Sequence, residues 1–296
     1  MNDRREGSES RKRPGGGESG TQPGGGESGT DLDFEEGRYL YCVVDADEDA
    51  TFTADGIEGE LVSILVEDGL GAVVQSVDSV YDSEDMTRVR RWLLTHQQVI
   101  DAAGDAFGTP LPFRFDTIFR GGDETVSEWL RDNHDELADA LDWLAGRWEY
   151  RIEVRWNEAA VRESVREEDA QLQELATSID EASSGTQYLL ESQFEQRLAD
   201  RLQHRSERLE AQLVENIEPY VVELQHSDTR ARVLPTEVEA DLDTAVQLSV
   251  LADSTHEEQI GEQLEAIADQ PQYEVRYTGP WPPYSHAPAI GGADEP

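Results

Sequence analysis

Apolar residues between positions 37 and 148 follow two spacings in turn. Residues 38–44 are rich in aromatic and β-branched side chains, and residues 60–77 hold two apolar runs separated by an Asp-Gly pair at 68–69. These patterns predict a buried strand followed by a β-hairpin, because Asp-Gly is a turn-forming pair between strands. Over residues 83–107 the apolar side chains recur every three or four positions, which predicts an amphipathic helix.

The next segment, residues 110–119, alternates apolar and polar side chains from position 113 onward. This alternation predicts a strand with two opposite faces. One face would carry Phe113, Phe115 and Thr117, and the other would carry Arg114, Asp116 and Ile118. On the second face Arg114 and Asp116 could form a structural ion pair, which is the favoured interpretation, or could contact a ligand.

Residues 123–145 return to the helical spacing. Asp123 follows two glycines and is expected to be the N-cap of this helix, and Gly146 is expected to end it. Residues 148–156 then alternate strictly between apolar and charged side chains, which predicts a further strand.

Two long helical patterns follow, at residues 158–182 and 186–217, and a Ser-Ser-Gly link joins them. Their apolar stripes are narrow and are flanked by Arg, Glu and Gln. A narrow stripe with charged flanks is typical of a helical hairpin that projects from its domain. We therefore expect residues 158–217 to form a helical arm.

The remaining patterns predict a strand near 244–251, a helix near 255–269 and a strand at 273–278. With the strand before the arm, the order is strand, long helices, strand, helix, strand, which fits a ferredoxin-like arrangement. The predicted fold class is therefore α+β with two domains. Residues 37–148 would form the N-terminal domain, and residues 149–286 a ferredoxin-like domain that carries the arm.

Both ends of the chain differ from this pattern. Residues 1–36 are of low complexity, and the sequence GGGESGT occurs there twice, at 15–21 and 24–30. Such a segment has too few apolar residues to fold, so a disordered tail is expected. Residues 287–296 are expected to be a flexible C-terminus.

The composition is extremely acidic. Asp and Glu number 65 against 24 Lys and Arg, which gives a formal net charge of −41, and Lys12 is the only lysine. Such a charge destabilises a compact fold unless salt screens it, so a halophilic cytoplasm is the expected setting. The charge argues against partners such as nucleic acid or a lipid membrane. No apolar run reaches the ~18 residues that span a bilayer, so a soluble cytoplasmic protein is expected.

Few residues suggest chemistry. The sequence contains no phosphate-binding glycine loop, no nucleophile elbow and no HExxH motif, so neither a cofactor nor a metal is expected and the protein is not predicted to be an enzyme. A single cysteine, Cys42, excludes an internal disulfide and is expected to be a small core residue. His96 lies on an apolar helix stripe, where a hydrogen-bonded core histidine is favoured over a general base or metal ligand.

Residues 277–285 read YTGPWPPYS. Three prolines force an extended, stiff backbone, from which Trp281 and Tyr284 project. Aromatic side chains on a stiff backbone lose little entropy when they dock. The segment is therefore expected to fasten onto its own domain, which is the favoured interpretation, or to dock on a partner.

Several segments together resemble the F/L family of gas vesicle accessory proteins (GvpF/GvpL). They are the early strand RYLYCVV, the segments HQQVIDAA and PLPFRFDTIF, the strand LAGRWEYRIEVRW, the hinge SGTQYLL and the terminal YTGPWPPYS. The resemblance runs from about residue 38 to residue 286. The Gly-rich extension and acidic composition look most like the haloarchaeal L branch. The chain departs from the family pattern at His286, where the family usually has Phe.

The resemblance implies a non-enzymatic role in building gas vesicles. It implies binding to the hydrophobic shell protein and to other accessory proteins during nucleation of the vesicle. The hypothesis places the contacting surface at Arg114, Phe115 and Thr117 of the N-terminal domain and at Trp281, Pro282, Pro283 and Tyr284 of the tail. The arm would reach other accessory proteins. The alternatives are a small-molecule-binding or regulatory ferredoxin-like module, and an enzyme of unknown type.

Overall fold

The computed structural model describes residues 33–226, 243–288 and Ile290. Most of the predicted tail at 1–36 lies outside these residues, and its last four positions, 33–36, belong to the first strand. Residues Asp33–Pro296 form one compact unit, in which two antiparallel sheets carry the described chain. Within the described part, no helix is long and apolar enough to cross a membrane.

The first sheet has the strand order β2-β3-β4-β1-β5, and β6 also pairs with β1. Its strands are β1 (Asp33–Asp45), β2 (Thr53–Asp55), β3 (Leu61–Glu67), β4 (Leu70–Ser79), β5 (Leu111–Pro112) and β6 (Ile118–Arg120). The predicted strand and hairpin are confirmed. Asp68 and Gly69 join β3 to β4 with φ angles of 49° and 90°, the positive values that a two-residue hairpin turn requires.

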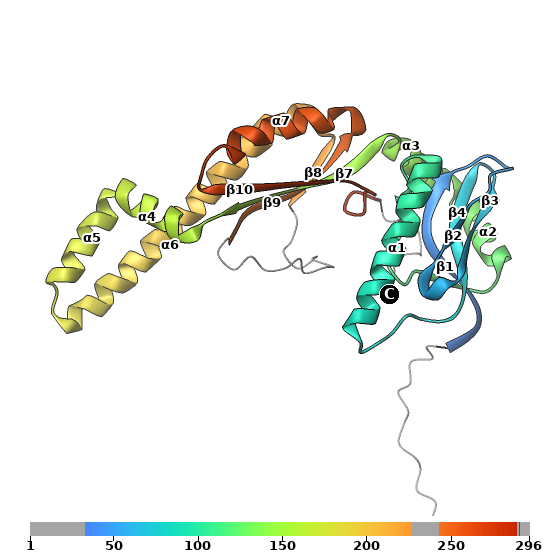
Figure 1. The fold of residues 1–296 in the computed structure, drawn as a ribbon, viewed down its shortest axis with the longest axis horizontal. Coiled ribbons are helices and arrows are strands. Elements are labelled where there is room, and N and C mark those ends of the chain that lie inside the picture. The colour runs from blue at the N-terminus through green and yellow to red at the C-terminus, as the bar shows by residue number, and fades with distance from the viewer. Residues whose placement is uncertain (1–32, 227–242, 289, 291–296) are drawn as a thin grey trace, which may run out of the picture. The chain divides into compact units, whose positions relative to one another are not determined.

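Helices cover both faces of this sheet (Figure 1). On one face lies α1 (Met86–Phe107), and on the other lie α2 (Asp123–Asp132) and α3 (His134–Leu144). Because both faces are covered, residues 39–44 of β1 are all buried, which explains their uninterrupted apolar run. Cys42 is among them, and burial raises the pKa of its thiol, so the prediction of a core cysteine is confirmed.

The prediction of one continuous strand at 110–119 is wrong at its centre. Residues 113–117 form a turn between β5 and β6, in which Asp116 has a φ of 69°. The Asp116 carboxylate accepts a hydrogen bond from the backbone N–H of Tyr81 at 3.1 Å, which holds the turn against the end of β4. The strand alternation that would place Arg114 and Asp116 on one face therefore does not apply.

The predicted helix at 123–145 is also two helices. Asn133 separates α2 from α3, and its side-chain amide donates to the Trp129 carbonyl at 2.8 Å. The N-cap of α2 is Gly122 rather than Asp123, whose carboxylate accepts a hydrogen bond from Arg38 Nε at 2.6 Å instead. Gly146 ends the segment as predicted, with a φ of 73°.

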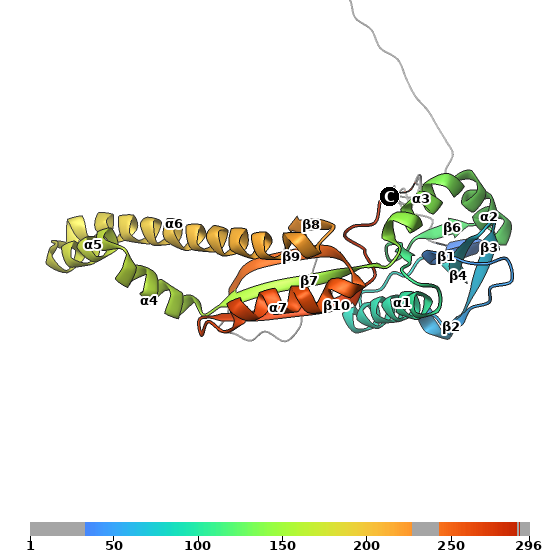
Figure 2. The same ribbon diagram turned by 90° about the horizontal axis from the view of Figure 1, so that it is seen from above.

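The second sheet has the order β10-β7-β9-β8. Its strands are β7 (Arg147–Trp156), β8 (Glu223–His226), β9 (Asp243–Asp253) and β10 (Tyr273–Trp281). Helices α6 (Ser184–Ile217) and α7 (Glu257–Ala268) lie on one face of this sheet (Figure 2). The strands predicted at 148–156, 244–251 and 273–278 are confirmed, with β10 extending to Trp281.

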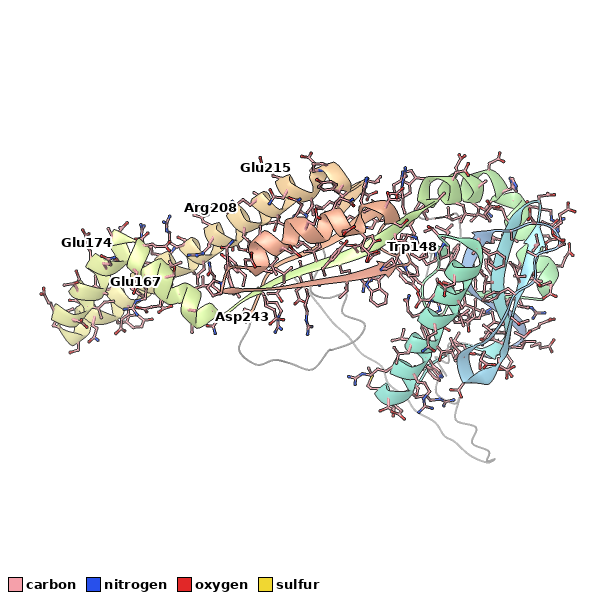
Figure 3. All side chains as sticks on the ribbon, turned by 45° about the horizontal axis from the view of Figure 1, so that its top comes forward. Trp148, Glu167, Glu174, Arg208, Glu215 and Asp243 are labelled. Carbon is pink, nitrogen blue, oxygen red and sulfur yellow. The ribbon has the colours of Figure 1, made fainter. Side chains whose placement is uncertain are left out.

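The predicted helical arm is present, but its first helix is broken. Residues 158–182 form α4 (Glu158–Glu168) and α5 (Ala170–Glu181), which pack against the N-terminal half of α6. The side chains of Glu167, Glu174 and Arg208 are exposed on these helices (Figure 3). The arm is thus a pair of short helices against one long helix, with a single narrow apolar seam between them.

Asp169 causes the break between α4 and α5. Its carboxylate caps α5 by accepting hydrogen bonds from the backbone N–H groups of Gln171 and Leu172, each at 3.0 Å. The same carboxylate binds Arg197 at 2.8 and 2.9 Å and Arg201 at 3.0 Å, both on α6. Asp169 therefore fastens the two sides of the arm together.

Candidate partner-binding surfaces

The turn at residues 113–117 brings the three N-terminal site residues together. Arg114 is exposed, Phe115 is partly buried, and the Thr117 hydroxyl donates to the Arg114 carbonyl at 2.8 Å. The Phe115 ring packs edge-on against Tyr39, with ring centroids 6.0 Å apart. The turn therefore presents Arg114 at its surface and fixes it by contacts underneath.

A buried hydrogen-bond chain lies beneath this turn. The backbone N–H of Asp116 donates to the Tyr39 hydroxyl at 3.2 Å, and that hydroxyl is 2.8 Å from His96 Nδ1. His96 Nε2 lies 3.2 Å from the Phe113 carbonyl, so Nε2 carries the proton and Nδ1 accepts from Tyr39. Burial lowers the pKa of His96 to about 4, which keeps the ring neutral.

This arrangement confirms the prediction of a core histidine. Both ring nitrogens of His96 are used inside the protein, and the residue is only 4% exposed. A small-molecule module would require a pocket lined by Arg114 and His96. Because His96 is buried and doubly bonded, the structure gives no support to that alternative at this position.

The C-terminal segment folds back onto the chain, and we call residues 281–288 with Ile290 the strap. Pro282 and Pro283 are buried, and Tyr284 packs in the apolar cluster between α1 and the first sheet. Ile290, 3% exposed, packs in the cluster on the opposite face of that sheet. Ala287 also packs against this second cluster, so the strap contributes to both cores of the first sheet.

A buried carboxylate holds the strap in place. Glu149 on β7 is fully buried and accepts hydrogen bonds from the backbone N–H of Ser285 at 2.8 Å and from its hydroxyl at 3.2 Å. Arg151 Nε donates to the same carboxylate at 2.9 Å. The charge of Glu149 is therefore paired, and its remaining hydrogen-bonding capacity fixes the strap.

Gly279, just before the strap, tolerates no side chain. Its φ is 141°, and a Cβ there would lie 2.7 Å from the Tyr150 ring and 2.9 Å from the Glu149 carbonyl. Only glycine allows β10 to approach β7 this closely. The glycine of the YTGPWPPYS segment is thus a packing requirement.

The strap residues of the predicted site differ in their accessibility. Trp281 is partly exposed, its indole nitrogen donates to Thr278 at 3.3 Å, and the Arg151 guanidinium lies 5.9 Å from its ring centre. Tyr284 instead lies near His96, with ring centroids 6.4 Å apart. Tyr284 and Phe115 thus meet at one histidine, whereas Trp281 lies on the second sheet.

The start of α6 exposes two apolar residues that the site prediction did not include. Tyr188 is 74% exposed and Leu189 is 60% exposed, in the hinge region of the arm. An exposed aromatic next to an exposed leucine at the end of a charged hairpin is a typical protein-contact feature. Both residues lie in the motif SGTQYLL, which the sequence predicts only as a hinge.

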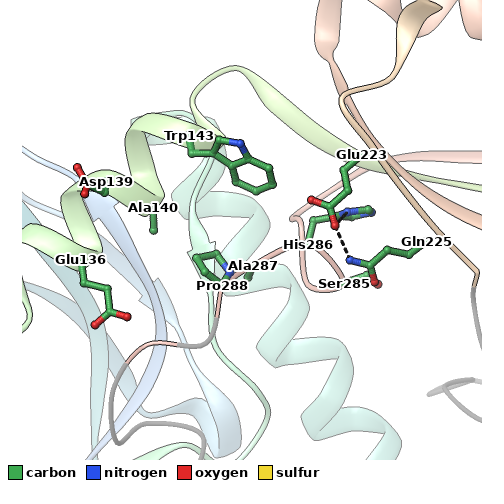
Figure 4. Close-up of a pocket in the computed structure, with 10 residues that line it drawn as sticks. All are labelled: Glu136, Asp139, Ala140, Trp143, Glu223, Gln225, Ser285, His286, Ala287 and Pro288. Carbon is green, nitrogen blue, oxygen red and sulfur yellow. Dashed lines mark hydrogen bonds and ion pairs between the residues drawn. The ribbon is translucent and has the colours of Figure 1, made fainter. Parts of the chain in front are cut away.

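A groove of about 590 Å³ lies between α3, β8 and the strap (Figure 4). Acidic residues stand on two of its walls, Glu136 and Asp139 from α3 and Glu223 from β8. Trp143 and Ala287 supply apolar surface between them. Sequence reasoning could not find this groove, because its walls come from three segments that are far apart in the sequence.

His286 forms part of the groove wall. Its side chain has no exposed surface, and its Nε2 lies 3.2 Å from the Ser249 hydroxyl. Its Nδ1 lies 3.5 Å from Glu223 Oε1 but has no hydrogen-bond partner among the described residues. Among these residues there is also no group of three or more His, Cys, Asp or Glu side chains that could hold a metal ion.

The comparison with protein families gives one match that spans both sheets. The model for "Gas vesicle synthesis protein GvpL/GvpF" matches residues 37–288. The chain belongs to the GvpL/GvpF family.

Curated relatives in this family include several haloarchaeal proteins. Gas vesicle protein L1 of Halobacterium salinarum is 43% identical over 86% of this chain and 92% of its own length. Gas vesicle protein L of Haloferax mediterranei is 36% identical over 86% of this chain and 89% of its own. The predicted resemblance to the F/L family is thus confirmed, and these two relatives come from haloarchaea.

Solved structures of GvpF share the fold. The GvpF structure from Anabaena sp. PCC7120 superposes with a TM-score of 0.69 at 22% identity, covering 86% of this chain and 99% of that one. GvpF from Microcystis aeruginosa superposes with a TM-score of 0.61 at 18% identity over the same shares. This chain therefore shares its mixed α and β architecture, with antiparallel sheets, with the solved GvpF structures.

Proposed function

We propose that this GvpL/GvpF protein acts in gas vesicle assembly as a non-enzymatic factor that binds the hydrophobic shell protein and other accessory proteins. The observation that carries the proposal is the family match over residues 37–288, together with haloarchaeal relatives named gas vesicle protein L. A shell subunit with exposed apolar surface aggregates unless another protein covers it. A partner with a net charge of −41 remains soluble while it holds such a subunit.

The shell-binding surface in this proposal is the turn at 113–117 with the strap behind it. Arg114 offers an exposed guanidinium, and Phe115 and Thr117 shape the turn around it. Pro282, Pro283 and Tyr284 contribute by supporting the core beneath the turn, because Tyr284 packs in the same cluster as Tyr39 and Phe115. Trp281 adds a partly exposed aromatic ring on the second sheet.

The arm is the proposed contact for other accessory proteins. It is charged along most of its length and ends in the exposed pair Tyr188 and Leu189. As part of the same proposal, the second sheet and its helices form a ferredoxin-like domain from which the arm projects. The order of the strands, β10-β7-β9-β8, and the succession of strands and helices support this assignment.

A capture experiment tests the shell contact. Full-length protein on beads is mixed with shell protein in molar KCl, and bound shell protein is quantified. Arg114→Glu combined with Phe115→Ser is expected to reduce capture about tenfold, as loss of a central contact does. Arg208→Glu combined with Leu189→Ser is the control, because it makes the same charge change and replaces an apolar side chain with serine on α6.

The control also separates the two proposed surfaces. It is expected to leave shell capture unchanged and to reduce capture of accessory proteins. Equal loss of shell capture in both variants would show that overall charge or stability controls the interaction, and the assignment to the turn would then be wrong.

A further inference from the structure

We infer that the groove between α3, β8 and the strap binds an arginine side chain from a short basic segment of another protein. The inference deepens the proposed function and rests on it only in taking the ligand to be a protein. The groove volume of about 590 Å³ is within the range of ~300–1,000 Å³ that ligand sites occupy. It therefore accommodates a large side chain and part of the backbone that carries it.

The charge of the walls indicates a cation. Glu136 and Asp139 are three residues apart on α3, and Glu223 from β8 lies on the other side of Trp143, Ala287 and Pro288 (Figure 4). The ten residues that line the groove include no Arg and no Lys. Carboxylates on low-dielectric walls reinforce each other's field in the space between them, which favours a cation and repels an anion.

The aromatic wall favours arginine over lysine. Trp143 lines the groove together with Ala287 and Pro288 of the strap. A planar, weakly hydrated guanidinium stacks on an indole ring, whereas a compact ammonium keeps more of its water. This ring already interacts with a guanidinium of its own chain, since Arg147 Cζ lies 5.8 Å from its centre.

A second, independent observation comes from His286. Its side chain is completely buried, and its Nδ1 has no hydrogen-bond partner among the described residues. When the Nε2–H donates to Ser249, Nδ1 is an acceptor that lacks a donor, 3.5 Å from Glu223 Oε1. A guanidinium that enters beside Glu223 has five N–H donors and can bind this carboxylate and Nδ1 together.

A bare metal ion fits the groove less well. The carboxylates stand on separate walls, and the described residues hold no group of three or more ligands that could coordinate one ion. Glu223 Oε1 is already held by the Gln225 amide at 2.8 Å, which orients this carboxylate. An oriented carboxylate accepts directional hydrogen bonds from the planar N–H groups of a guanidinium, which a bare metal ion does not offer.

Binding of model peptides tests the inference. Full-length protein is titrated into three fluorescein-labelled Gly-Ser peptides that carry two arginines, two lysines or two citrullines, and anisotropy is recorded at several KCl concentrations. The arginine peptide is expected to bind, the lysine peptide about three- to tenfold more weakly, and the neutral citrulline peptide at least about tenfold more weakly. Equal binding of all three peptides would overturn the inference.

Variants locate the binding. Glu136→Gln alters an exposed side chain and is expected to weaken arginine-peptide binding about threefold, while Glu223→Gln and His286→Phe are each expected to weaken it about tenfold. Glu174→Gln, an equal charge change on the arm, is the control and should have no effect. If Glu174→Gln weakens arginine-peptide binding as much as Glu136→Gln does, the peptide is attracted to the acidic chain in general. The assignment of the binding site to the groove would then be wrong.

The same proteins distinguish this inference from the proposed function. Glu136→Gln and Glu223→Gln are expected to retain shell-protein capture, because neither residue belongs to the turn at 113–117 or to the strap. If the unmodified protein binds the arginine peptide but does not capture shell protein, only the proposed function is contradicted. Normal shell capture without arginine-peptide binding would contradict the groove alone.

Discussion

The strap and the tip of the arm carry similar residues but use them in opposite ways. The strap buries Tyr284 and Ile290 in the two cores of the first sheet, while the arm leaves Tyr188 and Leu189 exposed. The difference lies in what holds each backbone. A buried carboxylate and a close glycine contact fix the strap, whereas the helix at the arm tip has Ser183 as its N-cap, whose side chain accepts no capping hydrogen bond.

This comparison shows that aromatic residues alone do not identify a docking segment. The motif YTGPWPPYS has stiff prolines and two aromatic rings, yet most of it packs on its own chain. The hinge SGTQYLL has weaker local signals and is the more accessible of the two. Polar groups that anchor the backbone, such as Glu149, decide which segment remains available to a partner.

Among the substitutions considered, replacing a glycine in each region should give the largest difference in protein stability between the strap and the arm. Gly279→Ala is expected to destabilise the protein by about 3 kcal/mol, because it combines a positive φ with contacts below 3.0 Å. Gly185→Ala, in α6 with nothing within 4 Å, is expected to be neutral or to stabilise by up to ~1 kcal/mol. Denaturant unfolding in molar KCl measures both, and equal effects would contradict the packing role of Gly279.

Breaking the ion pairs of Asp169 with Arg197 and Arg201, which we call the clasp of the arm, should have an intermediate effect on stability. Asp169→Asn keeps a capping side chain but removes the charge that binds Arg197 and Arg201, so a loss of about 1–2 kcal/mol is expected. Hydrogen exchange should show faster opening of α4 and α5 with no change in the first sheet. A loss of protection at the strap would show that the two regions are coupled.

The pH dependence of this clasp has a definite sign. Hydrogen bonds from Arg197 and neighbouring groups lower the pKa of Asp169 below its ordinary value of 3.8. Its stabilising contribution is therefore complete above about pH 4 and is lost as the pH falls through the lowered pKa. The difference in stability between the parent protein and Asp169→Asn should disappear in acid, and a constant difference would contradict the charge-based role.

Removal of the Tyr284 hydroxyl should change the free energy of unfolding only slightly, and in the direction opposite to that of Asp169→Asn. The Tyr284 hydroxyl is buried without a hydrogen-bond partner among the described residues, and burial raises its pKa well above 10, so it stays neutral. Tyr284→Phe is expected to be neutral or to stabilise by up to ~1 kcal/mol. A clear loss in the unfolding midpoint would reveal a partner for this hydroxyl.

The smallest effect on stability is expected at the arm tip. Tyr188→Ser with Leu189→Ser should change the free energy of unfolding by less than ~0.5 kcal/mol, because both side chains are exposed. Capture of accessory proteins should nevertheless fall. Unchanged capture together with unchanged stability would remove the proposed role of the tip.

Much of the fold could be predicted where local chemistry and tertiary packing agree. The hairpin at 68–69 and the helix stop at Gly146 both use residues that adopt positive φ easily, so the sequence signal and the structure coincide. The apolar run of β1 was equally clear, because helices cover both faces of its sheet. These features depend on few distant partners.

The errors arose where a polar side chain competes with the regular backbone. Asn133 and Asp169 each end one helix and start the next inside a continuous apolar stripe, and Asp116 turns a strand pattern into a loop. The stripe predicts which face is buried but not where a side chain replaces a backbone hydrogen bond. For the candidate sites, the turn residues could be chosen from the resemblance, whereas the groove depends on three distant segments.

The position of the strap in the chain has a consequence for biosynthesis. Tyr284 and Ile290 complete cores whose strands are made more than 160 residues earlier, so the first sheet emerges from the ribosome long before its last core residues. A nascent chain of this family member therefore keeps unfilled apolar sites throughout translation. Premature termination before Tyr284 would yield a product with both sites open, a substrate for chaperones and proteases rather than a working assembly factor.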